Sequence, residues 1–593
     1  MKKLGIFLFS FGIVGILVSV SIGEKKIPEL NASIFTLAEQ AMDAGLNKEN
    51  WQEVSLEAKK IPRIFPLSLI RKSFLEAEEI VLEVNQLKEN IPSLFTSPLD
   101  TEKILEEFKS LERIDKNLKR ISQNLNKIPD FLLDEKQQED LNHLQAKLRV
   151  VRWHLADIQK FKNILRQLSK NEEKILVLLQ NENEPRSTGG FTGSILNISL
   201  GKEEITWEFS DIYSLDRLIP GSSQLPAPDF FRDLSQTISL RDANFWPDFP
   251  TSSQKYREFF EDLGRPVPNI VLAINLNILE ELLSLTGPIK IPKWGVTANE
   301  HNVDLVLQFL VEAKVAGRFG AKEPLLSFAE ELFKTENFAS ITTDKLLNFD
   351  FSKFINQKNI LANSKNKELQ KLFETWQIDG LVQQKKEADN FLYFDFISVG
   401  ANKSEKFVWT KLWHDSEISK DGTVKNFVEI IRNHALKNGE ISTLLQDSSW
   451  PENVRELLVD EDLLWKLGEG QNRTFLRLFV PKNAKLLSQK NPSGFITENF
   501  SDDKKFKIFE IPMFVVPGEK IKIQLEYETK LERGSNNWRP YLLQVVGTPG
   551  REKTSFMSTI STTKNGKFTA ETKNIGKPQD LIDDDFRAVI EFE

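Results

Sequence analysis

Two apolar stripes with helical periodicity constrain the fold more than any other feature of this sequence. The first consists of eight residues with successive spacings of 4, 3, 3, 4, 3, 4 and 3: Ile104, Phe108, Leu111, Ile114, Leu118, Ile121, Leu125 and Ile128. The second follows nearly the same rule: Leu144, Leu148, Val151, Leu155, Ile158, Phe161, Leu165 and Leu168. Spacings that alternate between three and four place apolar side chains along one face of a helix. Because Pro129 and Asp130 interrupt the pattern, the stripes predict a long antiparallel helix pair.

This pair has two interpretations. In the first, the stripes face each other and form a self-contained α-helical hairpin, a stalk that spaces the following domains from the membrane. In the second, the stripes form a coiled coil that binds a partner or another copy of the chain. Shorter helices, interrupted at Pro62, Pro66 and Pro92, are expected between residues 30 and 95, at the base of the hairpin.

The N-terminus carries a candidate membrane anchor. Leu4 to Gly23 are twenty residues without a charge, flanked by lysines on both sides. A helix of this length spans about 30 Å, the thickness of the hydrocarbon core of a bilayer. The sequence lacks a good signal-peptidase site, which favours an uncleaved transmembrane helix. Since the short lysine-bearing tail favours the cytoplasm, we expect a single-pass protein of the cell membrane whose bulk is extracytoplasmic.

Charge and composition exclude several classes of function. The chain of 593 residues has a formal net charge of −8, and its basic residues are interleaved with acidic ones. Nucleic acid is therefore not expected as a partner, because its recognition needs a concentrated basic face. The sequence contains no cysteine, which excludes disulfides, thiolate metal sites and cysteine nucleophiles.

The pattern of predicted elements divides the chain into five parts. Strands and helices alternate from Lys174 onward, which predicts an α/β sandwich, and short strands dominate after Phe391, which predicts a C-terminal β-sandwich. The expected fold is multidomain α+β, with these boundaries: 1–23 transmembrane anchor, 24–172 helical stalk, 173–390 α/β domain with a helical subdomain, 391–550 β-rich sandwich and 551–593 polar tail.

Three polar clusters follow strands of the predicted α/β domain: Pro185–Gly190, Ser210–Asp216 and Leu240–Thr251. Open α/β sheets bind ligands in such loops. Glycine pairs let backbone N–H groups approach an anion, arginine forks match phosphate oxygens, and carboxylate or amide oxygens suit Mg²⁺. The clusters therefore predict a phosphate or pyrophosphate site, with Mg²⁺ as the cofactor.

The candidate site residues come from these clusters. The candidate catalytic residues are Arg186, Asp211, Arg241 and Asp242; the candidate ligand-binding residues are Ser187, Gly189, Gly190, Asn244 and Asp248; the candidate metal ligands are Asp211 and Asp216. Each has a structural alternative. Gly189 and Gly190 could form a tight turn, Arg241 and Asp242 a buried ion pair, and Asp248 part of a turn.

Several ordered blocks of this sequence resemble one family. They are Leu179–Ser194, Asp211–Asp216, Arg241–Ser252 and Leu282–Ile289, with a further block at Gly400–Ser404 that we interpret as either a binding loop or a surface turn. Together they resemble the bacterial domain of unknown function 4012 family, over roughly residues 170 to 530. The resemblance implies an anchored bacterial surface protein and no known reaction.

The order of elements is also similar to that of the LytR-CpsA-Psr family, whose members transfer glycan from a lipid pyrophosphate carrier to cell-wall peptidoglycan. This resemblance implies that Arg186 and Arg241 hold pyrophosphate and that Asp211 holds a metal. The sequence departs from that family at two points: Thr188 stands where an aspartate is expected, and Ser210 where an arginine is expected. The first departure removes a carboxylate from the expected metal ligands.

Two functions of different classes fit the sequence. The first is a membrane-anchored cell-envelope transferase or hydrolase that acts on a phosphate-linked glycan or cell-wall polymer. The second is a non-catalytic surface scaffold or adhesin with the same fold. A sensor of a soluble ligand is a third possibility. The enzyme hypothesis requires Arg186 and Arg241 to meet beside an acidic turn in one cleft.

Overall fold

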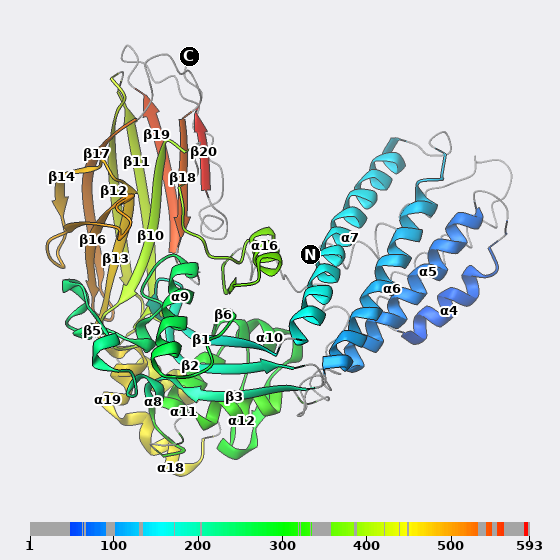
Figure 1. The fold of residues 1–593 in the computed structure, drawn as a ribbon, viewed down its shortest axis with the longest axis horizontal. Helices are drawn as coiled ribbons and strands as arrows, with labels where there is room; N and C mark the ends of the chain where they lie inside the picture. Colours follow the sequence, from blue (N-terminus) through cyan, green and yellow to red (C-terminus); the bar gives the residue numbers. More distant parts are fainter. Residues whose placement is uncertain are drawn as a thin grey trace.

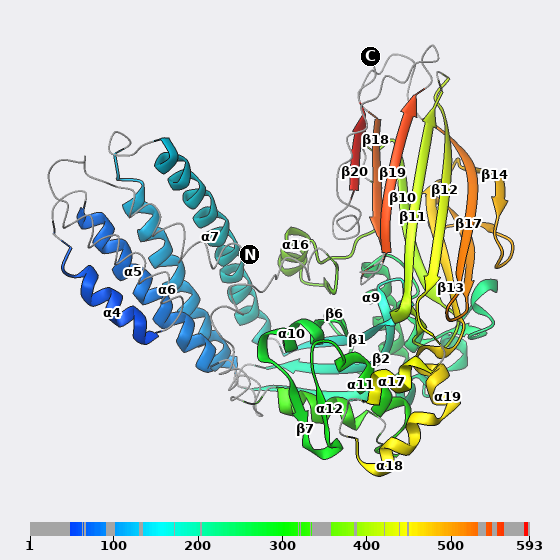
Figure 2. The same ribbon diagram turned by 180° about the vertical axis from the view of Figure 1, so that it is seen from behind.

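The computed structural model of the chain has three parts arranged as a V (Figure 1). Helices α4–α7 form one arm, a β-sandwich forms the other, and an α/β unit lies where the arms meet; the reverse view shows the same arrangement (Figure 2). The structure describes residues 48–590, leaving out 64–66, 91–100, 130–134, 335–356, 385–387, 447–449, 532–540, 550–553, 563–585 and some single or paired positions.

Four helices form the first arm: α4 Lys48–Ala58, α5 Leu67–Asn90, α6 Thr101–Leu125 and α7 Glu135–Ser169. The predicted stripe on α6 is buried at Ile114, Leu118, Ile121 and Leu125. Helices α4 and α5 are separated at the predicted interruption at Pro62 and Pro66, and α5 ends before Pro92. Helix α5 is longer than expected, with 24 residues, and packs along α6. It does so because it too has an apolar face, buried at Phe74, Ala77, Ile80 and Val81. The arm is therefore a bundle, larger than the predicted hairpin.

A five-stranded mixed sheet, ordered β3-β2-β1-β6-β9, is the centre of the α/β unit. Its strands are β1 Glu173–Arg186, β2 Gly189–Leu200, β3 Ile205–Asp211, β6 Ile270–Asn275 and β9 Ile360–Ser364. Strand β1 pairs parallel with β6, and the other neighbours pair antiparallel. One face of the sheet is covered by α9 (Phe249–Asp262), and the other by α16 (Lys367–Thr375) and the C-terminal end of α7.

The polar cluster Pro185–Gly190, expected to be a loop after a strand, is the tip of a strand hairpin. Strand β1 continues through Asn181–Arg186, and β2 begins at Gly189, so the two strands form one hairpin with a tight turn. Polar residues continue this strand because neighbouring elements satisfy them. Glu182 accepts a hydrogen bond from the backbone of Leu276 at 2.9 Å, and Asn183 donates to Asp304 at 3.2 Å. The tip of the hairpin projects towards the second arm of the molecule.

Smaller elements complete this unit. They are α8 Ile212–Asp216, β4 Leu225–Pro226, β5 Thr237–Ile238, the short 3-10 helix η6 Leu240–Asp242, α10 Ile278–Thr286, β7 Ile289–Ile291, β8 Val296–Ala298, α11 Val303–Glu312 and α12 Glu323–Leu332. Helices α10–α12 form the expected helical subdomain around a core of its own.

The second arm consists of two sheets that share one apolar core. The first sheet is ordered β15-β16-β13-β10-β18-β20, with β15 Thr497–Phe500, β16 Phe506–Val515, β13 Asn472–Pro481, β10 Asn390–Ser398, β18 Tyr541–Gly547 and β20 Phe586–Ile590. The second is ordered β14-β17-β12-β11-β19, with β14 Lys485–Lys490, β17 Lys520–Lys530, β12 Thr423–His434, β11 Val408–Ile418 and β19 Thr554–Thr562.

Two parts of the sandwich differ from the prediction. Strands β19 and β20 lie in the stretch expected to be a polar tail, where each forms an edge of one sheet. A helical insert stands between β12 and β13: α17 Glu440–Gln446, α18 Glu452–Arg455, η9 Glu456–Val459, α19 Glu461–Leu464 and η10 Trp465–Glu469. Its apolar residues join the core of α10–α12, so the insert ties the sandwich back to the α/β unit.

The predicted anchor at Leu4–Gly23 lies outside the described residues. Among the helices that are described, none is both long enough and apolar enough to cross a membrane.

Candidate functional site

Arg186 is buried at the tip of the β1–β2 hairpin. Its side chain is 1% exposed, with Nη2 at 3.3 Å from Asp242 and 3.5 Å from Glu184. Its Nη1 donates to the backbone oxygens of Pro185 at 3.0 Å and of Ser398 in β10 at 3.1 Å. The rings of Phe191 and Phe231 lie within 6 Å of the guanidinium. A phosphate ligand could not reach this arginine without opening the junction between the α/β unit and the sandwich.

Ser187, the next residue, is also buried at this junction. Its hydroxyl donates to the backbone oxygen of Phe245 at 2.6 Å and accepts from Nη2 of Arg477 at 2.8 Å. Arg477, on β13, pairs with Asp395 on β10 at 2.5 Å and lies 4.3 Å from the centre of the Phe245 ring. The sequence analysis did not identify Arg477 or Asp395. The signal that could have indicated them is a charged residue within each of two strands that are otherwise rich in aromatic residues.

Gly189 and Gly190 serve close packing. Gly189 has a φ of +135°, and a Cβ there would lie 2.3 Å from Oδ1 of Asn275. A Cβ on Gly190 would lie 2.0 Å from the backbone of Asn181. Asn244 donates to the backbone oxygen of Gly190 at 2.8 Å, so it braces the same turn. The glycines are therefore required by the turn itself, which is the structural alternative to an anion-binding loop.

Arg241 and Asp242 belong to the same charge network. Arg241 pairs with Asp216 at 3.0 Å and with Asp242 at 3.3 Å, and Asp242 in turn pairs with Arg186. Arg186 and Arg241 thus share one carboxylate. Unlike Arg186, Arg241 is 31% exposed, and its guanidinium lies 5.7 Å from the ring centre of Tyr213. The structure brings these two arginines together, but only one of them reaches the surface.

The two candidate metal ligands are placed differently. Asp216 accepts from the backbone N–H of Arg241 at 3.1 Å and from its guanidinium, so both of its oxygens are used. Asp211 precedes α8, and its Oδ1 is buried without a hydrogen bond. In the part of the chain that the structure describes, no group of three or more histidines and carboxylates is placed to hold a metal. The pair does not fit a Mg²⁺ site, because Asp216 is committed to Arg241.

Asp248 caps a helix. Its Oδ2 accepts from the backbone N–H of Thr251 at 3.0 Å at the start of α9, and its Oδ1 accepts from the backbone of Val382 at 3.2 Å. Both oxygens have structural roles, as expected of an aspartate at an N-cap.

The Gly400–Ser404 block lies at the junction and is not a surface turn. Asn402 and Ser404 are buried, and the hydroxyl of Ser404 donates to Asn402 at 2.6 Å. Between them, Lys403 pairs with Glu312 of α11 at 2.8 Å and lies 3.8 Å from Glu184 of β1. Because Glu184 also pairs with Arg186, these residues extend the network from Asp216 to Glu312.

Burial sets the electrostatics of this network. It raises the pKa of Asp242 and of Asp395, although the neighbouring arginines oppose that rise. It also raises the pKa of Glu182 to about 7 and that of Tyr213 to about 12. At Lys403, burial works against the charged form, but Glu312 and Glu184 outweigh it and raise the pKa. The lysine therefore stays charged, which the two carboxylates require.

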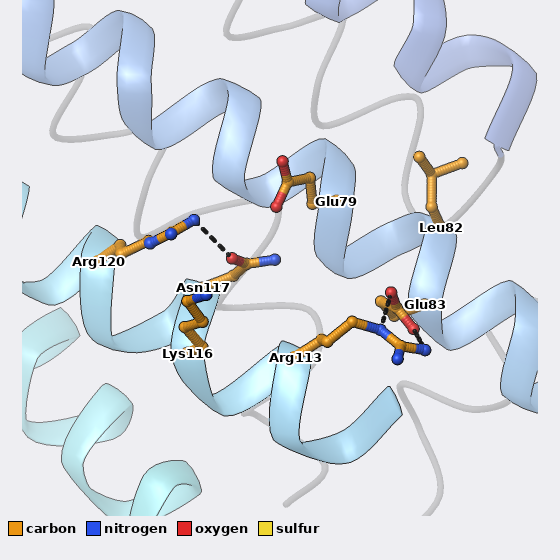
Figure 3. Close-up of a pocket in the computed structure, with 7 residues that line it drawn as sticks. All are labelled: Glu79, Leu82, Glu83, Arg113, Lys116, Asn117 and Arg120. Atoms are coloured by element: carbon orange, nitrogen blue, oxygen red, sulfur yellow. Dashed lines mark hydrogen bonds and ion pairs between the residues drawn. The ribbon is translucent and has the colours of Figure 1, made fainter. Parts of the chain in front are cut away.

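A shallow pocket of about 190 Å³ lies elsewhere, between α5 and α6. Figure 3 shows its lining of charged side chains, among which Arg113 is paired with Glu83. Arg120 contacts Asn117 and, outside the view, Glu76. Because these charges are satisfied by one another, the pocket reflects helix packing and adds nothing to the candidate site.

The fold and the site define a mixed α/β protein in which a hairpin turn and a chain of buried ion pairs join two domains. Residues 170–310, from β1 to α11, match the family model described as protein of unknown function DUF4012, in agreement with the family that the sequence blocks of this stretch predicted. No curated protein and no solved structure matches the chain.

Proposed function

We propose that this chain is a membrane-anchored extracytoplasmic scaffold of the bacterial cell envelope, and that the motifs of its α/β unit hold its two arms at a fixed angle. The observation that carries the proposal is the burial of Arg186, whose donors are all directed at protein acceptors from β1, η6 and β10. A scaffold needs a stiff joint between the part that is anchored and the part that is displayed. The apolar Leu4–Gly23 segment supports the anchor, and the helical bundle supports a spacer above it.

The buried ion pair between Arg186 and Asp242 resists separation of the elements that carry its two charges. Removing one partner leaves an uncompensated charge and costs several kcal/mol, about 3–5. The network therefore opposes any motion that would separate the hairpin tip from β10 and β13. Chains of ion pairs alone are weak evidence for stability, but here they connect three elements that are distant in sequence.

The second candidate function is a transferase or hydrolase acting on a lipid pyrophosphate-linked glycan. One observation favours it: Arg241 is partly exposed beside Tyr213, which lies two residues after Asp211 in the chain. In this alternative Arg241 would contact pyrophosphate.

A thermal-shift experiment on the full-length protein in detergent separates the two functions. Farnesyl pyrophosphate with Mg²⁺ is the probe, and the variants are Arg186→Ala and Arg241→Ala. Arg265→Ala is the matched control, because Arg265 is equally exposed and pairs only with a surface carboxylate. The scaffold predicts a lower Tm for Arg186→Ala without ligand and no shift with the probe. Stabilisation by the probe that is lost in Arg241→Ala and kept in Arg265→Ala would establish the enzyme instead.

Cysteine labelling tests on which side of the membrane each part of the chain lies. Because the sequence contains no native cysteine, only the introduced residue can react. A single Lys485→Cys substitution on exposed β14 should react with a membrane-impermeant maleimide on intact cells. Lys3→Cys should react only after permeabilisation. Labelling of Lys3→Cys and protection of Lys485→Cys on intact cells would reverse the proposed orientation.

A further inference from the structure

One face of the sandwich displays two exposed tryptophans, which lie outside the apolar core that the described residues of the sandwich form. In β11 the side chains alternate strictly, with Thr410, Leu412 and His414 buried and the intervening residues pointing outward. Among the outward residues, Trp409 is 52% exposed and Trp413 is 43% exposed. Met557 of β19 and Phe427 and Ile431 of β12 lie on the same face beside these rings, and an exposed apolar patch of this kind marks a binding surface. Figure 2 shows β11 running along the length of the arm beside β12 and β19.

The indole of Trp413 is held in place before any ligand arrives. Its Nε1 donates to Asp415 of the same strand at 2.8 Å, and Thr559 of β19 contacts the same carboxylate. Met557 is opposite Trp413 on β19, and Glu429 is opposite on β12. A ring fixed in this way loses little conformational entropy when a ligand stacks on it.

The surroundings of the tryptophans are polar and carry both charges. Lys411 stands between them on the strand, and Glu417 follows at the far end. On the neighbouring strands, Glu429 pairs with Lys522 at 2.8 Å and accepts from Gln524 at 2.8 Å. The face therefore combines aromatic and apolar side chains with hydrogen-bonding groups of both charges.

This pattern distinguishes among partners. The centre of a protein interface is depleted in charge, whereas Lys411 and Glu429 lie at the centre of this face. Nucleic acid and anionic lipid favour a concentrated basic surface, whereas Asp415, Glu417 and Glu429 stand beside the two tryptophans. A sugar ring has an apolar C–H face that stacks on an indole and an edge of hydroxyls that bonds to carboxylates, amides and ammonium groups. The face matches that chemistry.

We propose that the outer face of the β14-β17-β12-β11-β19 sheet binds a neutral polysaccharide chain, with Trp409 and Trp413 as stacking platforms. Four residues along a strand separate the rings by about 13 Å. That distance exceeds the size of one sugar ring, so the ligand is an oligomer or polymer and not a monosaccharide. The proposal deepens the scaffold function by naming the class of molecule that the displayed arm holds.

Glycan binding by the full-length protein in detergent tests the proposal. The probes are isolated peptidoglycan sacculi, chitin and cellulose in sedimentation assays, with chitohexaose and cellohexaose in calorimetry. Sacculi and chitin test amino-sugar chains of an envelope, and cellulose tests a foreign polysaccharide. We expect binding to at least one polymer, with quenching or a blue shift of tryptophan fluorescence.

Four variants make the result specific. Trp409→Ala and Trp413→Ala should each weaken binding at least tenfold, and Trp413→Phe should retain most of it because a stacking ring remains. The matched control is Trp207→Ala, since Trp207 is 49% exposed on β3 of the other sheet system. Absence of binding to all five probes, or full binding by folded Trp409→Ala and Trp413→Ala proteins, would overturn the proposal. Such a failure leaves the scaffold function standing, because that rests on Arg186 and the pyrophosphate experiment.

Discussion

Nη2 of Arg477 donates a hydrogen bond to the hydroxyl of Ser187 at 2.8 Å, although 290 residues separate them in the chain. Ser187 lies at the tip of the α/β hairpin and Arg477 in the middle of a sandwich strand. The same arginine neutralises Asp395 and covers the ring of Phe245. This contact explains why a polar Arg-Ser-Thr-Gly-Gly turn is buried: it is the point at which two domains meet.

Replacing Arg477 by methionine should therefore destabilise the protein strongly. The substitution leaves the carboxylate of Asp395 buried and unpaired, which costs about 3–5 kcal/mol. Chemical denaturation measures this loss. Arg473→Met on the same strand is the control, because Arg473 pairs with Asp233 at the surface, and it should cost about 1 kcal/mol or less. Equal losses in the two variants would contradict a role for Arg477 in the junction.

The double variant Arg477→Met with Asp395→Leu adds a second test. Removing both charges relieves the burial penalty, so the double variant should be more stable than Arg477→Met alone. If it is less stable by the sum of the two single effects, the two residues act independently and the ion pair is not the source of the stability.

Gly190→Ala is expected to disrupt the hairpin turn. Its new Cβ would lie 2.0 Å from the backbone of Asn181, and a backbone cannot move aside as a flexible side chain can. We expect a loss of about 3 kcal/mol or more, or failure to fold. Gly221→Ala, where a Cβ meets nothing within 4 Å, should be close to neutral. Thermal unfolding compares the Tm of the two variants. A Gly190→Ala protein as stable as the original would mean that the turn has another conformation.

Much of the secondary structure could be predicted from periodicity. Ile114, Leu118 and Leu125 are buried along α6 as their spacing predicted, and the run at Lys174 is the start of β1. These predictions succeed because apolar side chains of one element must share a face. The same holds for residue type at turns: Asp421 and Gly422 lie in the turn between β11 and β12, where Gly422 has a φ of +81° that glycine adopts readily.

The candidate site was predicted less well, because burial depends on partners that are distant in sequence. Polarity suggested that Asn181–Arg186 form a loop, yet Asp242, Ser398 and α11 satisfy these residues and let the strand continue. Arg186 and Arg241 were correctly grouped near Asp242, but nothing in their local sequence distinguishes the buried arginine from the exposed one. Lys403 was missed as a charged partner because its carboxylates lie some 90 and 220 positions earlier.

Lys403 provides a further test of the network. Lys403→Met should leave Glu312 without its paired cation and Glu184 with Arg186 as its remaining partner, at a cost of about 3 kcal/mol. Lys293→Met removes a surface pair with Glu323 and should cost about 1 kcal/mol or less. Denaturant unfolding compares the two. If Lys403→Met is as mild as the control, the buried network does not brace the Gly400–Ser404 block.

Buried histidines should make the sandwich sensitive to acid. His414 lies with Nδ1 at 3.0 Å from Ser558 and Nε2 at 3.1 Å from Asn426, and burial lowers its pKa from 6.5 to about 4. The unfolded chain then binds a proton that the folded one does not, so stability is complete above pH 6.5 and falls as the pH drops towards 4. The shift corresponds to about 3 kcal/mol. Burial also lowers the pKa of His434 to about 4, which adds to the loss of stability in acid.

Denaturant unfolding at pH 7.5, 6 and 5, followed by tryptophan fluorescence, should show the free energy of unfolding falling with pH. His414→Asn should reduce this slope. His143→Gln, at an exposed position on α7, should leave the slope unchanged. An undiminished slope in His414→Asn would mean that other groups set the acid sensitivity.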